Sequence, residues 1–357
     1  LFLINRILSG AAEASASGAD EALAYDTLKD LGLERSWGKV LETQMRFQSI
    51  AFIVAMSVGA LLYDAEHLNQ IFTALSFDIK VSKAFAIRIP LILTLLLGIG
   101  ALVTALGLKE PNSEKVTRRK ARKEDWFATI KEAFAKTLDT GKWILNTPVA
   151  MMIILGGFLI DHIARMILTL NSEYYRRIEL PEASFGIIGA VFGLMGLFTP
   201  RLGRWLSEKK TKTFNFSLIG IVTFFGLLGM TNFVPYWGVL PMIFIYGPIG
   251  LTRFLVSAYM NAETPSSGRA TALSFKGLFY NLAYGGIGLI YSLLVYKLRR
   301  TESMQANPAE QVDAELFKSA LSYFPSYFSV AFVLVLLFGI INRHSIDTSP
   351  LTKDDST

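Results

Sequence analysis

The chain has 357 residues, of which 52% are apolar and 18% are charged, with a formal net charge of +6 at pH 7. Because soluble domains carry about 25% charged residues, this composition excludes an ordinary soluble protein and predicts a membrane protein. The sequence holds no cysteine and only three histidines, so disulfides, thiolate catalysis and cysteine metal sites are excluded and a histidine-rich metal site is not expected.

Several stretches are apolar and, at about 17 to 25 residues, long enough to cross a bilayer. In chain order the nine predicted spans are 1–28, 47–63, 84–108, 147–170, 184–206, 214–233, 237–260, 270–296 and 316–341. Lysine and arginine concentrate in alternate connecting segments, which places the end of the first span and residues 109–146 on the cytoplasmic side. The predicted fold class is therefore an all-α membrane protein, a polytopic helical bundle with about nine transmembrane helices.

The longest connection, 109–146, separates three predicted spans from six. Its segment WFATIKEAFAKTL, at 126–138, has helical amphipathic periodicity and predicts a surface helix on the cytoplasmic leaflet, with a solvated linker as the alternative. Since many transporters consist of two six-helix bundles, we expect three further spans to precede residue 1. The predicted units are 1–108 (remainder of an N-terminal helical bundle), 109–146 (cytoplasmic linker with an amphipathic helix), 147–342 (C-terminal six-helix bundle) and 343–357 (cytoplasmic tail).

Three short motifs resemble those of the major facilitator superfamily, a large family of twelve-helix secondary transporters. Arg6-x-x-x-Gly10 resembles the R-x-x-x-G motif of the fourth helix. PSSGRATALS, at 265–274, resembles the P-x-x-x-R-A-T-x-L-S run between the tenth and eleventh helices, and Glu110-Pro111 resembles the end of the sixth. The order of these motifs resembles that of a superfamily member that is truncated at its N-terminus and keeps helices 4 to 12.

The resemblance implies a secondary transporter that moves a small solute by alternating access. We expect coupling to protons, a monomer, and a multi-pass location in a bacterial inner membrane. The expected partners are the solute, protons and the lipid bilayer, without nucleic acid and without a cofactor or metal. A protein of the same fold that senses or scaffolds without transport is the alternative, and an enzyme is not expected because no nucleophile with a matching base stands out.

Ionisable side chains inside a membrane span are costly and normally face the bundle interior or a water-filled cavity. In the superfamily, helices one, four, seven and ten line the central cavity, and the resemblance assigns charged residues of this chain to the last three. Aromatic and amide side chains on the tenth and eleventh helices complete the set. The predicted translocation residues are Arg6, Glu13, Asp161, Arg165, Tyr246, Arg253, Tyr280 and Asn281.

Glu13 is the candidate for proton coupling, because an apolar setting favours a neutral carboxyl group whereas an approaching arginine favours the ionised form. A permanent salt bridge is the alternative for Glu13. Asp161 and Arg165 stand at i and i+4 with the acid first, the favourable order for an ion pair on a helix. This pair is either structural or a site where substrate or a proton competes for one partner. The arginines and acids together suit an anionic or zwitterionic solute, and equally a set of internal pairs.

Acids followed by an arginine recur at the predicted cytoplasmic ends of the helices in both halves. We expect these charges to form a salt-bridge cluster that closes an inner gate, with solvated loop charge as the alternative. The predicted gate residues are Asp20, Glu21, Asp26, Arg46, Glu263 and Arg269. A row of glycines in the 184–206 span also predicts close helix packing; it consists of Gly186, Gly189, Gly193 and Gly196.

Overall fold

The computed structural model describes residues 18–107 apart from 64, 75, 77–79 and 87, residues 126–181, 184–300 and 309–347, and residues 4 and 8. This described part folds into helices and turns, without a strand. The α-helices are α2 (Ala19–Asp30), α3 (Trp37–Tyr63), α4 (Ala65–Ala74), α5 (Lys83–Ala86), α6 (Ile89–Leu106), α7 (Trp126–Asn146), α8 (Pro148–Arg177), α9 (Phe185–Lys209), α10 (Lys212–Met230), α11 (Ile243–Glu263), α12 (Arg269–Arg299), α14 (Ala309–Ile341) and α15 (Arg343–Asp347).

Seven helical stretches of the described part are long and apolar enough to cross a membrane. They are Lys83–Leu106, Pro148–Arg177, Phe185–Lys209, Lys212–Met230, Trp237–Glu263, Arg269–Arg299 and Val312–Ile341. These stretches coincide with the last seven predicted spans, so the prediction of an all-α multi-pass bundle is confirmed at this level. Of the other two predictions, 47–63 forms the second half of α3, and 1–28 lies mostly outside the described residues.

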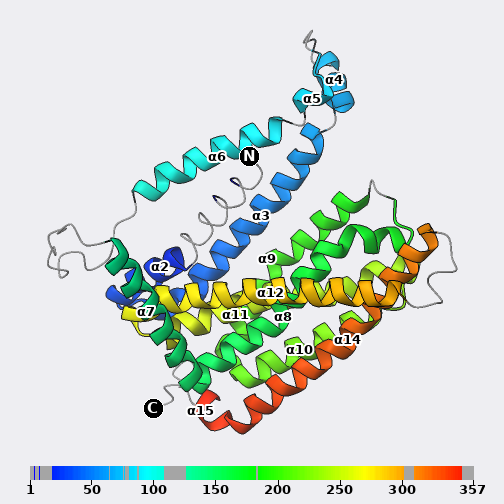
Figure 1. Ribbon diagram of the computed structural model, residues 1–357. Helices are drawn as coiled ribbons and strands as arrows, with labels where there is room; N and C mark the ends of the chain where they lie inside the picture. The colour runs from blue at the N-terminus through cyan, green and yellow to red at the C-terminus, as the bar shows by residue number, and fades with distance from the viewer. Residues whose placement is uncertain are drawn as a thin grey trace.

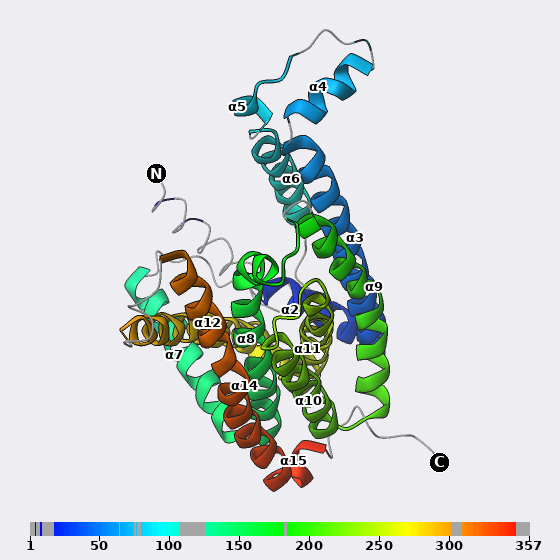
Figure 2. The same cartoon turned by 90° about the vertical axis from the view of Figure 1, so that its right-hand side faces the viewer.

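Helix α8 packs against α10, α11, α12 and α14 and so forms the centre of the bundle that these helices build, and α10 also packs directly against α14 (Figure 2). Two adjacent glycines let its neighbours approach closely. A Cβ atom on Gly156 would lie 2.5 Å from the Phe216 ring of α10, and one on Gly157 would lie 1.7 Å from the Tyr280 hydroxyl of α12. Because a side chain at either position would displace an aromatic ring, these glycines set the distance of α10 and α12 from α8.

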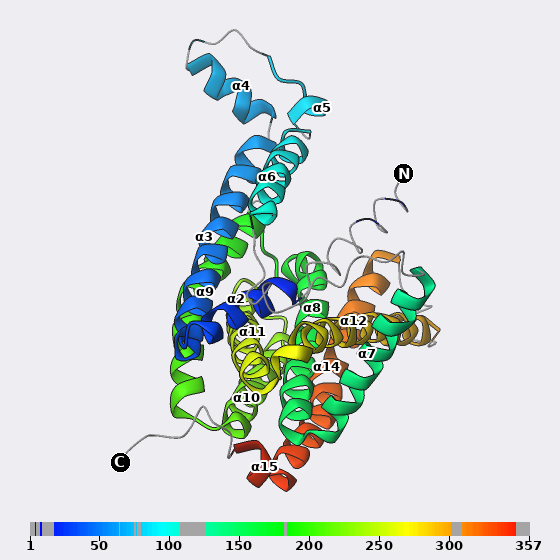
Figure 3. The ribbon, with the colours of Figure 1, turned by 90° about the vertical axis from the view of Figure 1, so that its left-hand side faces the viewer.

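Helix α3 lies along α9 and joins the N-terminal part of the chain to the C-terminal bundle (Figure 1). A Cβ atom on Gly196 would lie 3.0 Å from the Ser49 Cβ, and one on Gly193 would lie 3.1 Å from Ile53. The close packing predicted for this glycine row is therefore present at Gly193 and Gly196, whereas Gly186 faces open space. Helix α6 contacts α3 near the end of α3 (Figure 3) and then diverges from it (Figure 1), and its apolar stretch is not buried within the protein.

Two further contacts fix one end of the bundle. The predicted amphipathic helix at 126–138 is the first part of α7, which packs against α12. There a Cβ atom on Gly141 would lie 2.9 Å from the Phe275 ring near the start of α12. At the same end, α15 caps the start of α10, because an Asp347 carboxylate oxygen accepts hydrogen bonds from the Thr213 backbone N–H and hydroxyl, both at 3.2 Å. This cap satisfies one of the backbone donors that every helix start leaves unpaired.

Candidate functional site

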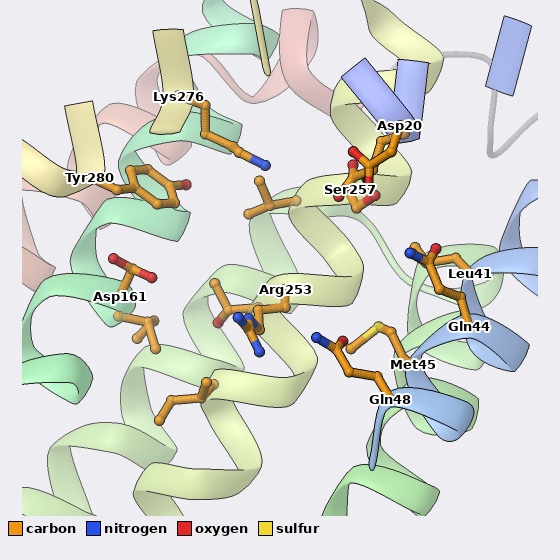
Figure 4. Close-up of a pocket in the computed structure, with 15 residues that line it drawn as sticks. Asp20, Leu41, Gln44, Met45, Gln48, Asp161, Arg253, Ser257, Lys276 and Tyr280 are labelled. Carbon is orange, nitrogen blue, oxygen red and sulfur yellow. Dashed lines mark hydrogen bonds between the residues drawn. The ribbon is translucent and has the colours of Figure 1, made fainter. Parts of the chain in front are cut away.

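A cavity of about 320 Å³ lies between α2, α3, α8, α11 and α12. Helices α2 and α3 precede the long connection and the other three follow it, so both parts of the chain supply its walls (Figure 4). The lining is rich in polar groups, including two glutamines of α3 and side chains of both charges. The charged residues that line it are Asp20, Glu21, Asp161, Arg253 and Lys276.

The α8 wall of the cavity carries the predicted pair of Asp161 and Arg165. The Arg165 Nε and Nη2 groups donate to one Asp161 carboxylate oxygen at 2.7 and 2.5 Å. Arg165 also donates through Nη1 to the Asn281 side-chain oxygen at 2.8 Å, and its guanidinium lies 5.1 Å from the centre of the Tyr284 ring. Helix α12 therefore holds the arginine in place, and Asp161 presents its carboxylate to the cavity with a cation already attached.

Tyr280, one of the predicted translocation residues, lines the cavity from α12. The Tyr280 hydroxyl donates a hydrogen bond to the Ile154 carbonyl oxygen at 3.3 Å, in the space left free because Gly157 has no side chain. Tyr280 is only 8% exposed, so most of its ring is buried in the contact between α8 and α12.

Two other cations of the cavity, Arg253 on α11 and Lys276 on α12, differ from Arg165 in their bonding. Within the described part of the chain, neither side chain has a hydrogen bond or an ion pair. Figure 4 shows the Lys276 ammonium group directed into the cavity and the Arg253 side chain lying between Asp161 and Gln48. Arg253 was predicted, whereas Lys276 was missed, although its charge inside the predicted span 270–296 is visible in the sequence.

Next to the cavity, α2 closes against α11 and α12 through an arginine at the start of α12. The Arg269 side chain is 1% exposed and forms an ion pair with the Asp26 carboxylate of α2. Its Nε donates to the Asn261 carbonyl at 3.0 Å, and its Nη2 donates to the Thr264 carbonyl at 2.7 Å. The guanidinium also stacks on the Tyr25 ring of α2, 4.4 Å from the ring centre. One buried cation thus joins three helices.

Glu21 makes a second connection between α2 and α11. One Glu21 carboxylate oxygen accepts hydrogen bonds from the Ser257 hydroxyl at 2.7 Å and the Asn261 side-chain amide at 3.3 Å. The start of α2 is held equally closely, because a Cβ atom on Gly18 would lie 2.4 Å from the Leu273 Cβ of α12. Gly18 has a φ of 78°, a conformation that glycine adopts without the steric cost of a side chain.

Two other predicted gate residues, Arg46 and Glu263, lie in separate ion-pair groups, and Asp20 lines the cavity. Arg46 pairs with Glu42 of its own helix at 2.9 Å, and Glu42 also binds Arg204 of α9 at 2.6 Å. Glu263 pairs with Lys212 of α10 at 3.1 Å. Asp26 and Arg269 are therefore brought together, while Arg46 and Glu263 serve other helix contacts. The Glu42–Arg46 pair could have been predicted, because the sequence places Glu42 four residues before Arg46.

The remaining predicted residues lie at the edge of the cavity or beyond it. Tyr246 stacks on Phe192, accepts a hydrogen bond from the Asn171 side chain at 2.6 Å, and lines a second hollow of about 240 Å³ between α3, α9 and α11. Arg253 lines both hollows. The Arg6 and Glu13 predictions fall outside the described residues. Within the described ranges, no group of three or more His, Cys, Asp or Glu side chains is placed to hold a metal ion.

Two comparisons with known proteins gave no match. No protein-family model matches the chain, and no curated protein matches its sequence.

Proposed function

We propose that the protein is a secondary transporter of the major facilitator type, in a bacterial inner membrane, that moves a small solute by alternating access with coupling to protons. The observation that carries this proposal is the polar cavity walled by both parts of the chain. Ionisable side chains inside a membrane-spanning bundle ordinarily mark a path for ions or solutes.

In this proposal the contact of α2 with α11 and α12 is the closed state of one gate. Opening breaks the Asp26–Arg269 ion pair and the hydrogen bonds that Glu21 accepts. Arg269 keeps its hydrogen bonds to the Asn261 and Thr264 carbonyls, because all three groups belong to the C-terminal bundle. The gate therefore opens without leaving the buried guanidinium devoid of acceptors.

Asp161 is the described acid best placed for proton coupling, because it lines the cavity and binds Arg165. A proton on Asp161 removes the negative charge that holds Arg165, which frees the arginine for another acceptor. Proton binding and solute binding are then linked through one side chain, as a coupled carrier requires.

The test is solute transport by the purified protein in liposomes, recorded as current on a solid support and as pH change inside the vesicles. The panel comprises amino acids, monocarboxylates, dicarboxylates, sugars and phosphate esters, each with and without a pH gradient. We expect a signal for at least one solute class and a loss of about tenfold or more in Arg253→Gln. Arg299→Gln, which alters an exposed arginine of α12 paired with Asp313, serves as the control and keeps the signal.

A wild-type protein that gives neither current nor pH change with any class contradicts the proposal. That outcome favours the alternative of a sensor or scaffold with the same fold.

A further inference from the structure

Two cations of the cavity differ from the other charges around it. Arg253 and Lys276 come from different helices, α11 and α12, and both line the same cavity. Neither has an ion pair or a hydrogen bond within the ranges that the structure describes. Arg253 is exposed and Lys276 is half-buried, so both side chains are open to a molecule that enters the cavity.

Three acids line the same cavity, and within the described residues only Asp161 among them is paired with a cation; Glu21 and Asp20 both come from α2. Asp161 is bound to Arg165 through two of the guanidinium nitrogens. Glu21 accepts hydrogen bonds from two side chains of α11. Asp20 is exposed and lies at the α2 end of the cavity, near Ser257 (Figure 4). Within the described part of the chain, none of the three acids forms an ion pair with either cavity cation.

In the residues that the structure describes, the α3 wall of the cavity carries no charged side chain. Gln44 and Gln48 of α3 line the cavity and are both exposed. Each carries an amide group with two N–H donors, which can add hydrogen bonds to a bound oxygen without adding charge. The planar guanidinium fork fits the oxygens of a carboxylate or phosphate, and an ammonium group adds a point charge beside it.

We infer that the cavity binds an anionic group, the carboxylate or phosphate of a water-soluble solute, through Arg253 and Lys276. The identification of this anion as the transported solute rests on the proposed function. The preference of the cavity for anions is a property of the site alone and is measured without transport.

The experiment exploits the absence of cysteine from the sequence. Gln48→Cys places a single thiol in the cavity of the protein in membrane vesicles. Its modification rate is measured with two reagents of similar size, the anionic sulfonatoethyl and the cationic trimethylammonioethyl methanethiosulfonate. The ratio of the two rates is divided by the same ratio for a small free thiol in solution.

The normalised ratio is expected to favour the anionic reagent. Arg253→Gln and Lys276→Gln, each added to Gln48→Cys, are expected to lower it by about fivefold, because one unit charge is removed near the thiol. Lys297→Gln, an exposed lysine on the same helix as Lys276, is the matched control and leaves the ratio unchanged. Asp20→Asn is expected to change the ratio in the opposite direction. Acetate or inorganic phosphate at high concentration is expected to slow the modification by both reagents.

A ratio at or below that of the free thiol, or one that neither neutralising substitution lowers, overturns the inference. Gln44→Cys provides a second position if Gln48→Cys does not fold, and a failure of both reagents at both positions also overturns it, since a sealed cavity admits no solute. A cavity that prefers anions in a protein without transport refutes the proposed function alone. Transport of neutral or cationic solutes with no anion preference refutes this inference alone.

Discussion

The Arg269 guanidinium of α12 binds the Asp26 carboxylate of α2, and the arginine side chain is 1% exposed while that of the aspartate is 24% exposed. The pair joins two helices that lie on opposite sides of the long connection in the sequence. Because the cation is the more deeply buried partner, loss of the aspartate leaves a desolvated positive charge without its counter-ion.

The first prediction concerns the stability that this pair confers. Asp26→Asn is expected to lower the free energy of unfolding by about 3 kcal/mol, at the low end for a buried pair because two carbonyls still accept from Arg269. Unfolding in mixed detergent micelles measures the change. Asp313→Asn is the matched control: it breaks the Arg299–Asp313 pair, whose side chains are 61% and 60% exposed, and should cost less than about 1 kcal/mol. Equal losses in the two variants would contradict the prediction.

The second prediction concerns the proposed opening of α2 away from α11. Glu21→Cys with Ser257→Cys replaces two side chains whose oxygens lie 2.7 Å apart. Bridging the two thiols with a short bifunctional thiosulfonate should stop transport, and reduction should restore it, because α2 can then no longer leave α11. Arg299→Cys with Asp313→Cys is the control within the C-terminal bundle, where these two exposed side chains of α12 and α14 form an ion pair. Bridging this second pair should leave transport intact.

The third prediction concerns the close contact of α8 with α12. Gly157→Ala places a methyl group 1.7 Å from the Tyr280 hydroxyl, so the ring must move and its hydrogen bond to the Ile154 carbonyl is lost. The expected loss of stability is about 1–3 kcal/mol, as for other overpacked cores. Gly285→Ala on α12 has nothing within 4 Å and should be neutral or stabilising by up to about 1 kcal/mol. Thermal unfolding of both variants in detergent decides between these outcomes.

The fourth prediction concerns the cap that α15 places on α10. Asp347→Ala removes the acceptor for the Thr213 N–H and hydroxyl, at 3.2 Å each. The expected loss is about 1 kcal/mol, the usual effect of removing a helix cap. Asp139→Ala, at an aspartate of α7 whose side chain is 75% exposed, should have a smaller effect. A stability unchanged by Asp347→Ala would show that the Thr211 side chain, which accepts from the Phe214 N–H, caps α10 alone.

The fifth prediction concerns proton coupling. Asp161→Asn removes the acid that binds Arg165 at the cavity wall. In the proposed carrier, exchange of labelled solute across liposomes should continue, whereas accumulation driven by a pH gradient should fall by about tenfold or more, because a proton can no longer bind at this position. Asp313→Asn serves again as the control. Accumulation that persists in Asp161→Asn would assign the coupling to another acid.

The positions of the helices were predictable, because an apolar run long enough to cross a bilayer is read directly from the sequence. The predicted span 84–108 corresponds to Lys83–Leu106, and 214–233 corresponds to Lys212–Met230. Lengths were less predictable: α8 continues to Arg177, seven residues beyond its apolar run, where Arg177 pairs with Glu173 one turn earlier. Because polar residues at a helix end lengthen the helix without adding to its apolar run, a prediction from hydropathy ends the helix too early.

The pairing of charges was less predictable than their presence. Two ion pairs have the i, i+4 spacing that can be read from the sequence alone: Asp161 with Arg165, and Glu42 with Arg46. The partner of Glu263 is Lys212, on another helix, and no spacing rule connects them. Such partners depend on which helix faces are brought together, which follows from the packing of small residues such as Gly156 and Gly157.

The Asp26–Arg269 pair also sets an order for biosynthesis. Its partners are separated by 243 residues, so at the usual 5–20 residues per second the aspartate is made about 12 to 49 s before its arginine. During that interval α2 has neither its ion pair nor the surfaces of α11 and α12 to bind. Helix α2 can therefore take up its final packing only when α12 has been synthesised.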